Sequence, residues 1–444
     1  MNLPDFVTQH WKANRGGDLL VGALPVSSLL ARYGTPFFLY DRGIVERKYQ
    51  ALRRVLPESF AIAYSVKANP NPAFLRFFLE QGCALEIASE GEFHQAKAAG
   101  CSPANLLFAG PGKTESELEL VIAEGIGEIH SESSLEVDRI SRISRRLGAR
   151  TSIAIRVNPA GNEGGGAMTM GGKSAPFGVD EEQLEPLLAR VASDPQLQFC
   201  GIHLFVGTQI LDHELLLAQY RAGLKIAKRA ADFLNISLRM LDFGGGLGVP
   251  YFPGDCQLDL LQLGRGLTDL ISEAKKEPCF RQTRFVVEPG RFLVAEAGLY
   301  IARINDIKIS RGKKYLILDG GMNHHLAASG NLGQIVKRNF PMAIVNKLDA
   351  VETETVEVVG PLCTPLDTLG RSVQLARADV GDLLGIFQSG AYARTASPTG
   401  FLSRASAPEV WVENGQDVLV RERGTFEDYM HDLLPFRAMA ESDV

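Results

Sequence analysis

Between Phe60 and Gly290 the sequence alternates eight times between a short apolar run with β-forming residues and a longer amphipathic run. The amphipathic runs, for example 114–125, 134–148 and 212–234, repeat apolar residues at intervals of three and four, which predicts helices. The expected strands are residues 60–66, 84–89, 105–110, 128–132, 151–157, 199–207, 240–245 and 284–290. Eight β/α units match a (β/α)8 barrel, which takes about 250 residues, better than an open doubly wound sheet.

The pattern of apolar and polar residues changes after residue 290. Strand-like runs with turn signals replace the helical periodicity, in KYLILDGG, TVEVVGPL, DLLGIFQ, APEVWVEN and QDVLVRERG. We therefore expect a barrel over 37–290 and a separate β domain over 291–444. Residues 1–36 precede the first barrel strand, and their pattern leaves open whether they join the β domain or stay peripheral.

Composition excludes several classes of protein. The net charge of −6 disfavours general nucleic-acid binding, and no run approaches the roughly 20 apolar residues of a membrane span. The polar N-terminus resembles neither a secretory signal nor a transit peptide, so we expect a cytoplasmic protein. The six cysteines are scattered, and we expect reduced thiols and no metal site. His130 is interpreted as a surface or helix position and is given no role.

A barrel predicts where chemistry occurs, because active sites of such barrels lie at the carboxyl ends of the strands. Lys67 ends the first expected strand, and Glu86 the second. His203 and Phe205 lie two apart on the sixth strand and so face the same way. The seventh and eighth strands end in FGGGLG (243–248) and EPGR (288–291), where barrels commonly bind phosphate.

A lysine, a carboxylate and a phosphate cradle at one barrel mouth suit pyridoxal phosphate. This cofactor needs a lysine amine for its aldehyde, a partner for its pyridine nitrogen and donors for its phosphate. Glu288 is the candidate partner of the nitrogen, and we expect burial to lower the pKa of Lys67. Each motif alone has a plainer explanation: a solvated lysine, a tight βα turn or an ordinary loop.

The motifs together resemble the fold-type III pyridoxal-phosphate decarboxylases, which include the diaminopimelate and ornithine decarboxylases. The resemblance lies in YSVKAN, LEIASEGE, FAGPGK, RVNP, GIHLFVGTQ, DFGGGLGVPY, EPGRFLV, GPLCTPLD and SGAY. It implies an alanine-racemase-like barrel, a β domain that includes the N-terminal segment, and a homodimer with active sites at the subunit interface.

The resemblance also implies roles for individual residues. Lys67 would hold the cofactor, Glu288 would pair with the pyridine nitrogen, and Cys363 from the partner subunit would be the catalytic proton donor. The remaining cofactor-binding residues would be Glu86, Arg156, Phe205, Thr208, Gly244, Gly245, Gly246, Gly290, Arg291 and Tyr392. Substrate would meet His203, Arg291, Asp319, His324, Cys363, Thr364 and Tyr392, although His203 could equally fill the barrel.

Three departures from the family pattern concern the substrate and the ring face. Phe205 stands where most members stack a histidine on the cofactor ring, and Thr364 replaces an acid that reads a distal amine. The stretch 319–330 has no arginine for a distal carboxylate. The two losses at the distal end of the substrate, Thr364 and the missing arginine, indicate a substrate other than lysine, ornithine or diaminopimelate.

The stretches MGGKSAPFG, GGMNHHLAASGN and GPLCTPLDTLG resemble a subgroup associated with exosortase-type loci and with butirosin biosynthesis. That resemblance implies decarboxylation of an amino acid whose side chain is modified or tethered to an acyl carrier protein. Lys337 and Arg338 are a candidate basic docking patch, or simply a solvated loop. The alternatives are a diaminopimelate-type or other free amino-acid decarboxylase, an amino-acid racemase, and a non-catalytic homologue that binds the cofactor.

Overall fold

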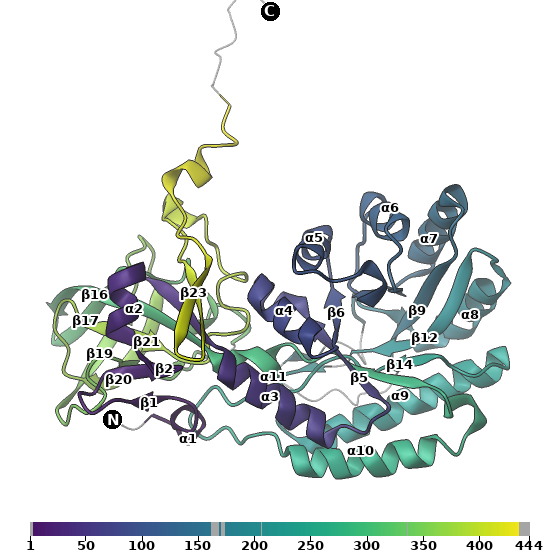
Figure 1. Cartoon of the computed structure of the whole chain (residues 1–444), viewed down its shortest axis with the longest axis horizontal. Coiled ribbons are helices and arrows are strands. Elements are labelled where there is room, and N and C mark those ends of the chain that lie inside the picture. The colour runs from purple at the N-terminus through teal and green to yellow at the C-terminus, as the bar shows by residue number, and fades with distance from the viewer. Residues whose placement is uncertain (1–2, 161–167, 170–173, 206, 335, 435–444) are drawn as a thin grey trace, which may run out of the picture.

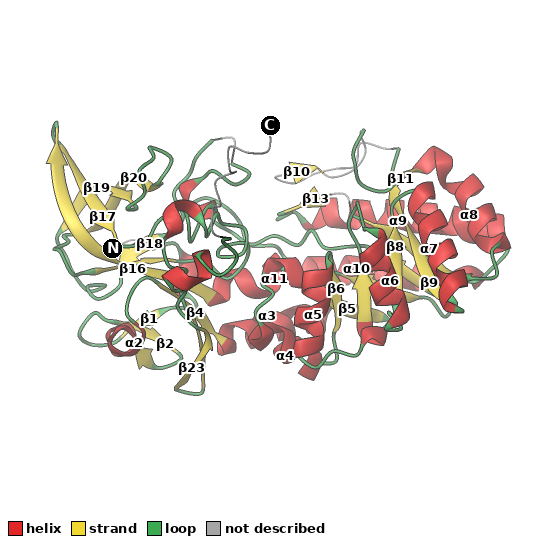
Figure 2. Cartoon of the chain, turned by 90° about the horizontal axis from the view of Figure 1, so that it is seen from above, coloured by secondary structure: helices red, strands yellow, loops and turns green. Residues whose placement is uncertain are grey.

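The computed structural model describes residues 3–160, 168–169, 174–205, 207–334 and 336–434 of the chain. Residue 206 of the sixth expected strand, residues 170–173 of the MGGKSAPFG stretch and residue 335 lie outside this set. Two bodies lie side by side, with the barrel helices in one and most of the antiparallel strands in the other (Figure 1, Figure 2).

The expected barrel is confirmed in the described chain. Eight parallel strands pair in the order β9-β12-β14-β15-β5-β6-β7-β8, and β8 pairs back to β9 and closes the ring. Their bounds are β5 Phe60–Ser65, β6 Ala84–Ile87, β7 Leu106–Phe108, β8 Glu128–Ser131, β9 Thr151–Asn158, β12 Leu197–Leu204, β14 Met240–Asp242 and β15 Arg284–Val287. A short strand, β11 Val179–Asp180, adds to the carboxyl end of β9.

Helices surround the barrel on its outer side (Figure 1). They are α3 Arg42–Val55, α4 Pro72–Glu80, α5 Glu90–Ala98, α6 Glu115–Ala123, α7 Ser134–Leu147, α8 Leu184–Ser193, α9 His213–Leu234 and α10 Leu260–Ala274. α6 begins with a capping box in which the Thr114 hydroxyl accepts from the Glu117 amide and the Glu117 carboxylate accepts from Thr114.

Several barrel helices begin at a residue whose side chain accepts a backbone N–H of the first turn: Asn71, Ser89, Thr114, Ser133 and Asp212. Asp180 precedes a short 3-10 turn without capping it, and its carboxylate accepts from the Asn158 side chain.

The second body is built on a mixed sheet with the order β20-β19-β17-β16-β4-β22-β23. Its strands are β4 Phe37–Asp41, β16 Gly298–Ser310, β17 Lys313–Leu318, β19 Thr353–Val359, β20 Thr368–Ala376, β22 Glu409–Glu413 and β23 Gln416–Arg421, and β21 Leu383–Ile386 joins β16 to β18 Met342–Ile344. β4 lies past residue 36, so the N-terminal contribution to this sheet runs to Asp41. The division of the chain at 36 and 290 stays a prediction.

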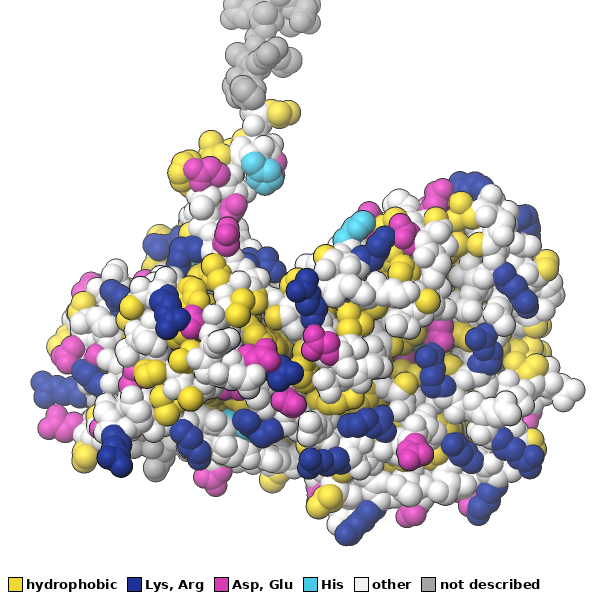
Figure 3. Space-filling model, viewed as in Figure 1, with side chains coloured by type: hydrophobic (Ala, Val, Ile, Leu, Met, Phe, Trp, Pro, Cys, Tyr) yellow, Lys and Arg dark blue, Asp and Glu magenta, His cyan; other side chains and the backbone are white. Residues whose placement is uncertain are grey.

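Short elements complete the structure. α1 Asp5–Thr8, α2 Val26–Tyr33 and a small sheet of β1 Lys12–Ala13, β2 Leu19–Val21 and β3 Leu24–Pro25 pack beside the second body, and α11 Arg291–Val294 links it to the barrel. β10 Met168–Thr169 pairs with β13 Gly207–Thr208. None of the described helices is long and apolar enough to cross a membrane. The face drawn in Figure 3 intersperses basic and acidic side chains.

The barrel interior holds a layer of mostly small apolar side chains: Ala63, Leu107, Ala154, Cys200, Met240 and Val286. Because each strand alternates inward and outward positions, the next inward position toward the carboxyl ends carries polar residues on several strands. The fold therefore builds a closed floor of apolar side chains with a polar mouth above it.

Candidate active site

A cavity of about 840 Å³ opens at the carboxyl ends of the barrel strands. Residues from both bodies line it, including Phe340 and Tyr392 from beyond residue 290. Nine of the expected site residues are in its wall: Lys67, Glu86, Arg156, His203, Phe205, Thr208, Glu288, Arg291 and Tyr392. The structure therefore brings the lysine, the carboxylate and the phosphate-binding candidates to one place.

Lys67 sits in a short 3-10 turn, Val66–Ala68, directly after β5. Its Nζ donates to both carboxylate oxygens of Glu86, at 2.9 and 3.1 Å, and the Ser65 hydroxyl donates to the same buried carboxylate at 2.5 Å. The Lys67 side chain is 42% exposed, so a ligand in the cavity can reach its amine.

The expected lowering of the pKa of Lys67 is wrong for this structure. Burial lowers the pKa of Lys67, but the charge of Glu86, followed by Tyr392 and Glu288, raises it, and the net shift is upward. Desolvation loses because carboxylates lie within ion-pairing distance of the ammonium. Glu86 therefore holds Lys67 as a cation.

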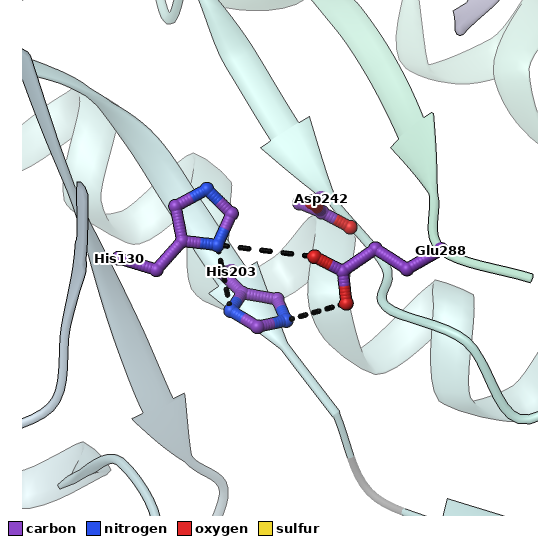
Figure 4. A group of neighbouring side chains, drawn as sticks. All are labelled: His130, His203, Asp242 and Glu288. Carbon is purple, nitrogen blue, oxygen red and sulfur yellow. Dashed lines mark hydrogen bonds and ion pairs between the residues drawn. The ribbon is translucent and has the colours of Figure 1, made fainter. Parts of the chain in front are cut away.

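Glu288 follows β15, and its side chain is almost completely buried at the barrel mouth. Burial raises the pKa of Glu288, but His203, then His130 and Lys67 beside it, lower the pKa well below its ordinary value. His203 Nε2 lies 3.4 Å from Glu288 Oε2, and His130 Nδ1 lies 4.0 Å from Oε1 (Figure 4). Glu288 Oε1 makes no hydrogen bond within the described chain. An ionised carboxylate with one free oxygen can accept a hydrogen bond from a protonated pyridine nitrogen.

Phe205 and Arg156 form one side of the cavity. The Arg156 guanidinium lies 5.7 Å from the centre of the Phe205 ring, and Lys67 Nζ lies 6.0 Å from the same centre. The guanidinium is held by an ion pair of 2.7 Å to Glu132 on the loop after β8. A planar ligand ring has an aromatic face to stack on here, beside a fixed cation.

The glycines after β14 fit close to the cavity wall. A Cβ at Gly245 would lie 2.6 Å from the Glu288 carbonyl oxygen, and a Cβ at Gly244 would lie 2.5 Å from the Leu204 carbonyl oxygen. Gly244 also has a φ of +69°, which favours glycine. The sequence therefore needs glycine here for the backbone to approach the end of β15.

Arg291 supplies positive charge beside this glycine turn. Its Nη1 donates to the Tyr251 hydroxyl at 3.0 Å, its guanidinium lies 4.7 Å from the centre of the Tyr392 ring, and its buried Nε has no partner within the described residues. Gly290, where a Cβ would lie 2.8 Å from the Ala68 Cβ, keeps the start of α11 against the Lys67 turn. Backbone amides, tyrosines and an unsatisfied guanidinium donor are chemically suited to a phosphate.

Besides Gly244, Gly245, Gly246 and Gly290, four further expected site residues are not in the wall of the cavity of this subunit. Asp319 accepts from Thr35 Oγ1 and the Arg303 amide, and His324 bonds to the Tyr300 hydroxyl and the Ala405 carbonyl. These partners give Asp319 and His324 a structural role in the second body, and they do not support the expected contact with substrate.

Cys363 and Thr364 also lie outside this cavity, on a loop that Asp367 holds by accepting from the Met322 and Leu362 amides. Cys363 is exposed, so it is accessible to another subunit. The role of Cys363 as a proton donor from a partner subunit stays a prediction.

His130 is the residue that the sequence interpretation missed. It is fully buried inside the barrel, and its Nδ1 lies 3.0 Å from His203 Nδ1. The period-two alternation of β8 is the signal that could have found it, because Glu128 and His130 share the inward face. The ligand atoms of His130, His203, Asp242 and Glu288 lie within 4.8 Å of one another, a grouping that sequence spacing did not reveal.

The residues of the cavity fit pyridoxal phosphate. Lys67 offers an amine, Glu288 a free carboxylate oxygen, Phe205 a ring face, and the Gly245 turn with Arg291 a cradle for phosphate. Each group that the cofactor needs is present at the same barrel mouth.

Comparisons with known proteins agree with this fit. The family "Pyridoxal-dependent decarboxylase, pyridoxal binding domain" matches residues 42–295. The L-glutamyl-(BtrI acyl-carrier protein) decarboxylase of Niallia circulans is 36% identical over 406 residues, 91% of this chain and 94% of that protein. A diaminopimelate decarboxylase of Methanothermobacter thermautotrophicus is 32% identical over 94% of this chain and 96% of its own length.

Solved structures give the same result. A crystal structure from Aquifex aeolicus has a TM-score of 0.85 and 28% identity, and covers 97% of this chain and 100% of that one. The diaminopimelate decarboxylase of Helicobacter pylori, complexed with L-lysine, has a TM-score of 0.82 and 27% identity over 91% of this chain and 98% of that one. The chain therefore belongs to the pyridoxal-dependent decarboxylases of the ornithine and diaminopimelate decarboxylase type, and it is a carboxy-lyase that uses pyridoxal phosphate.

Proposed function

We propose that the enzyme removes the α-carboxylate of an amino acid whose side chain is tethered to an acyl carrier protein. The observation that carries the proposal is the 36% identity to the L-glutamyl-carrier-protein decarboxylase, nearly end to end, against 32% for the diaminopimelate decarboxylase of Methanothermobacter thermautotrophicus and 30% for that of Aquifex aeolicus. Both classes of relative decarboxylate an amino acid. They differ in what lies at the far end of its side chain.

The wall of the cavity supports a substrate with an uncharged extension. Phe252, Phe340, Leu332 and Val336 line it together with the reaction centre, and Leu332 and Val336 are 41% and 75% exposed, which places them toward the opening. An apolar channel wall suits a pantetheine arm better than a free ammonium or carboxylate, because the charged groups nearest these side chains, Asp255 and Arg338, already pair with each other.

The bound cofactor accepts the electron pair that the departing carboxylate leaves behind. Lys67 would hold it, Glu288 would keep its ring nitrogen cationic, and Arg156 and Phe205 would fix the ring face. Thr208, the turn of Gly244, Gly245 and Gly246, Gly290, Arg291 and Tyr392 would bind its phosphate. Glu86, which accepts from the Lys67 ammonium, would take the proton that this amine must lose before it can hold the cofactor.

The proton that replaces CO2 at the α-carbon has a candidate donor in Cys363 of a partner subunit. The described cavity wall contains no thiol, whereas Cys363 is exposed on a loop outside it. We therefore infer a homodimer, in which Cys363 of one subunit reaches the cavity of the other. The segment after β23 also supports an interface. It projects from the body (Figure 1), and it carries apolar side chains in the open, with Phe426 72% exposed and Leu434 90% exposed.

Arg338 is the candidate contact for the acidic carrier. Its guanidinium lies 3.8 Å from the centre of the Phe252 ring and 3.4 Å from Asp255, its side chain is 54% exposed, and it lines the same cavity as Lys67. Lys337 donates to Asn331 and is not in the cavity wall. A fixed cation at the rim can meet the phosphodiester of a phosphopantetheine arm.

The test compares CO2 release from L-glutamyl carrier protein, L-glutamyl pantetheine, free glutamate, lysine and diaminopimelate. We expect the carrier-linked substrate to react fastest, and Arg338→Ala to lower kcat/KM for it by about 10-fold. Arg377→Ala is the matched control, because Arg377 is also exposed and ion-paired, to Glu352, and lies outside the cavity wall.

Faster turnover of free lysine or diaminopimelate than of any tethered substrate would refute the proposal and favour the second candidate, a free diamino-acid decarboxylase. The 30% identity to the diaminopimelate decarboxylase of Aquifex aeolicus, over 93% of this chain, is the observation that keeps this candidate.

A further inference from the structure

Four polar side chains lie together inside the barrel, where branched apolar residues usually fill the space. They are His130 on β8, His203 on β12, Asp242 at the end of β14 and Glu288 after β15, and Figure 4 shows them pointing toward one another. All four are buried. Burying so many polar atoms is costly unless they are arranged to satisfy one another, so this cluster needs a physical explanation.

A metal ion is one occupant that these residue types could bind. However, the two Nδ1 atoms of His130 and His203 lie 3.0 Å apart and share a hydrogen bond, which a metal would have to break. The ion would also compete with the cofactor nitrogen for Glu288. The cluster is therefore better explained as a chain that runs from His130 through its hydrogen bond to His203 and on to Glu288, 3.4 Å from His203.

The protonation of this chain follows from its geometry. Burial lowers the pKa of His203 to about 4, so its ring is neutral near pH 7 and carries one N–H. Its Nε2 faces Glu288 Oε2 at 3.4 Å, within ion-pair distance but without a hydrogen bond in the described chain, and Glu288 is ionised. A nitrogen lone pair would repel the carboxylate, so the proton is on Nε2. His203 Nδ1 must then accept a hydrogen bond, and only a proton on His130 Nδ1 can supply it across their contact.

We propose that His130 is a positioning residue for Glu288: it donates from Nδ1 to His203, and so fixes the tautomer that donates from Nε2 to Glu288. The inference rests on the proposed pairing of Glu288 with the cofactor ring nitrogen. It assigns one carboxylate oxygen, Oε2, to His203 and leaves Oε1, which has no partner in the described chain, for the ring nitrogen.

Glu128 competes with His203 for the proton of His130, because its Oε2 lies 3.8 Å from His130 Nε2 at the far end of the chain. Glu128 Oε1 also pairs with Arg284, which weakens this competition, and the shorter contact of 3.0 Å between the two Nδ1 atoms favours the proton on His130 Nδ1. Burial and then Glu288 raise the pKa of Asp242 well above its ordinary value, which disfavours a second negative charge beside Glu288. On the cavity side, Lys67 lowers the pKa of Glu288 and Arg156 lowers the pKa of His203.

The first experiment reads the tautomer directly. In the apoprotein with 15N-labelled histidine, we expect His203 to show a protonated Nε2 and an unprotonated Nδ1 from pH 6 to 8. His130→Leu removes the donor and should move the proton to Nδ1. His130→Asn, whose amide nitrogen can take the place of Nδ1, should restore the original tautomer. His325→Leu is a control at another fully buried histidine, whose described partners are Ser389 and Ala328.

The second experiment measures affinity for pyridoxal phosphate and for 1-deazapyridoxal phosphate, in which carbon replaces the ring nitrogen. We expect His130→Leu to weaken binding of the first by about 10-fold to 100-fold and to leave the second within twofold, because the analogue does not use Glu288. His130→Asn should rescue the affinity, and thermal unfolding checks that each variant is folded.

Either of two results would overturn the proposal: a protonated His203 Nδ1 in the wild-type apoprotein, or equal weakening of both ligands by His130→Leu, which would mean a merely structural role. Equal wild-type affinity for the two ligands is a different failure. It would refute the pairing of Glu288 with the ring nitrogen. The tautomer of His203 would still be tested, because that measurement uses the apoprotein.

Discussion

Substitution of Gly245 by alanine tests whether the turn after β14 is the phosphate cradle. The added Cβ would lie 2.6 Å from the carbonyl oxygen of Glu288, well inside normal contact distance. That oxygen is backbone and cannot rotate away, and the Glu288 amide donates to the Gly244 carbonyl at 2.8 Å, which ties the turn to the end of β15. The turn or the strand end must therefore shift, and both carry groups proposed to hold the cofactor.

Overpacking of this kind costs about 1 to 3 kcal/mol. If the strain is relieved by moving the turn, affinity for pyridoxal phosphate falls by about 5-fold to 150-fold. Titration of the apoprotein, followed by absorbance, measures the affinity, and thermal unfolding measures the stability. Gly91→Ala in α5 is the matched control, because its Cβ meets only Ser89 Oγ at 3.7 Å and should stabilise the helix by up to about 1 kcal/mol. Wild-type affinity and stability in Gly245→Ala would refute this account of the turn.

Three further outcomes follow from the site and the buried histidines. Lys67→Ala should abolish both turnover and the trapping of the cofactor by borohydride, and mass spectrometry that still finds a trapped adduct would contradict the assignment. Glu288→Gln should weaken cofactor binding by about 10-fold to 100-fold, and unchanged affinity in a direct titration would contradict the pairing. Burial lowers the pKa of His203 and of His324 to about 4 and of His325 to about 3, below the unfolded value of about 6.5. Above pH 6.5 these rings are neutral in both the folded and the unfolded state and do not change the free energy of unfolding. As pH falls toward 4, the unfolded rings take up protons that the folded rings do not, and each ring lowers the free energy of unfolding by about 1.4 kcal/mol at pH 5.5. Urea unfolding with the same free energy at pH 8 and 5.5 would show that these rings are not held neutral.

The barrel could be predicted because its signal is local. Each strand from Phe60 to Val287 is a short apolar run between amphipathic helices, and the structure differs from the expected strands mainly at their ends. The site followed from the barrel, since the carboxyl ends of parallel strands meet at one edge. Lys67, Glu86 and Glu288 were therefore expected near one another before any contact was known.

What the sequence could not supply depends on distances between strands. His130 looked like a surface residue because nothing in its own segment reveals that His203, 73 positions away, faces it across the barrel. The sequence predicts a lowered pKa for Lys67 from burial alone. It does not show the ion pair with Glu86, which is a tertiary contact and raises the pKa. β16, Gly298–Ser310, was not expected, since its second half is exposed and polar and hides the strand periodicity.

The loss of the usual histidine at position 205 has a physical explanation in the same cavity. The ring at this position lies near two cations, with the Arg156 guanidinium 5.7 Å and Lys67 Nζ 6.0 Å from its centre. A histidine placed there would be held neutral, because neighbouring positive charges oppose its protonation. A neutral imidazole and a phenyl ring both offer a stacking face, and the phenyl ring also attracts the two cations through its π surface. Compared with a histidine, Phe205 therefore lacks a hydrogen bond at the ring edge. It still offers an aromatic face on which the cofactor ring can stack.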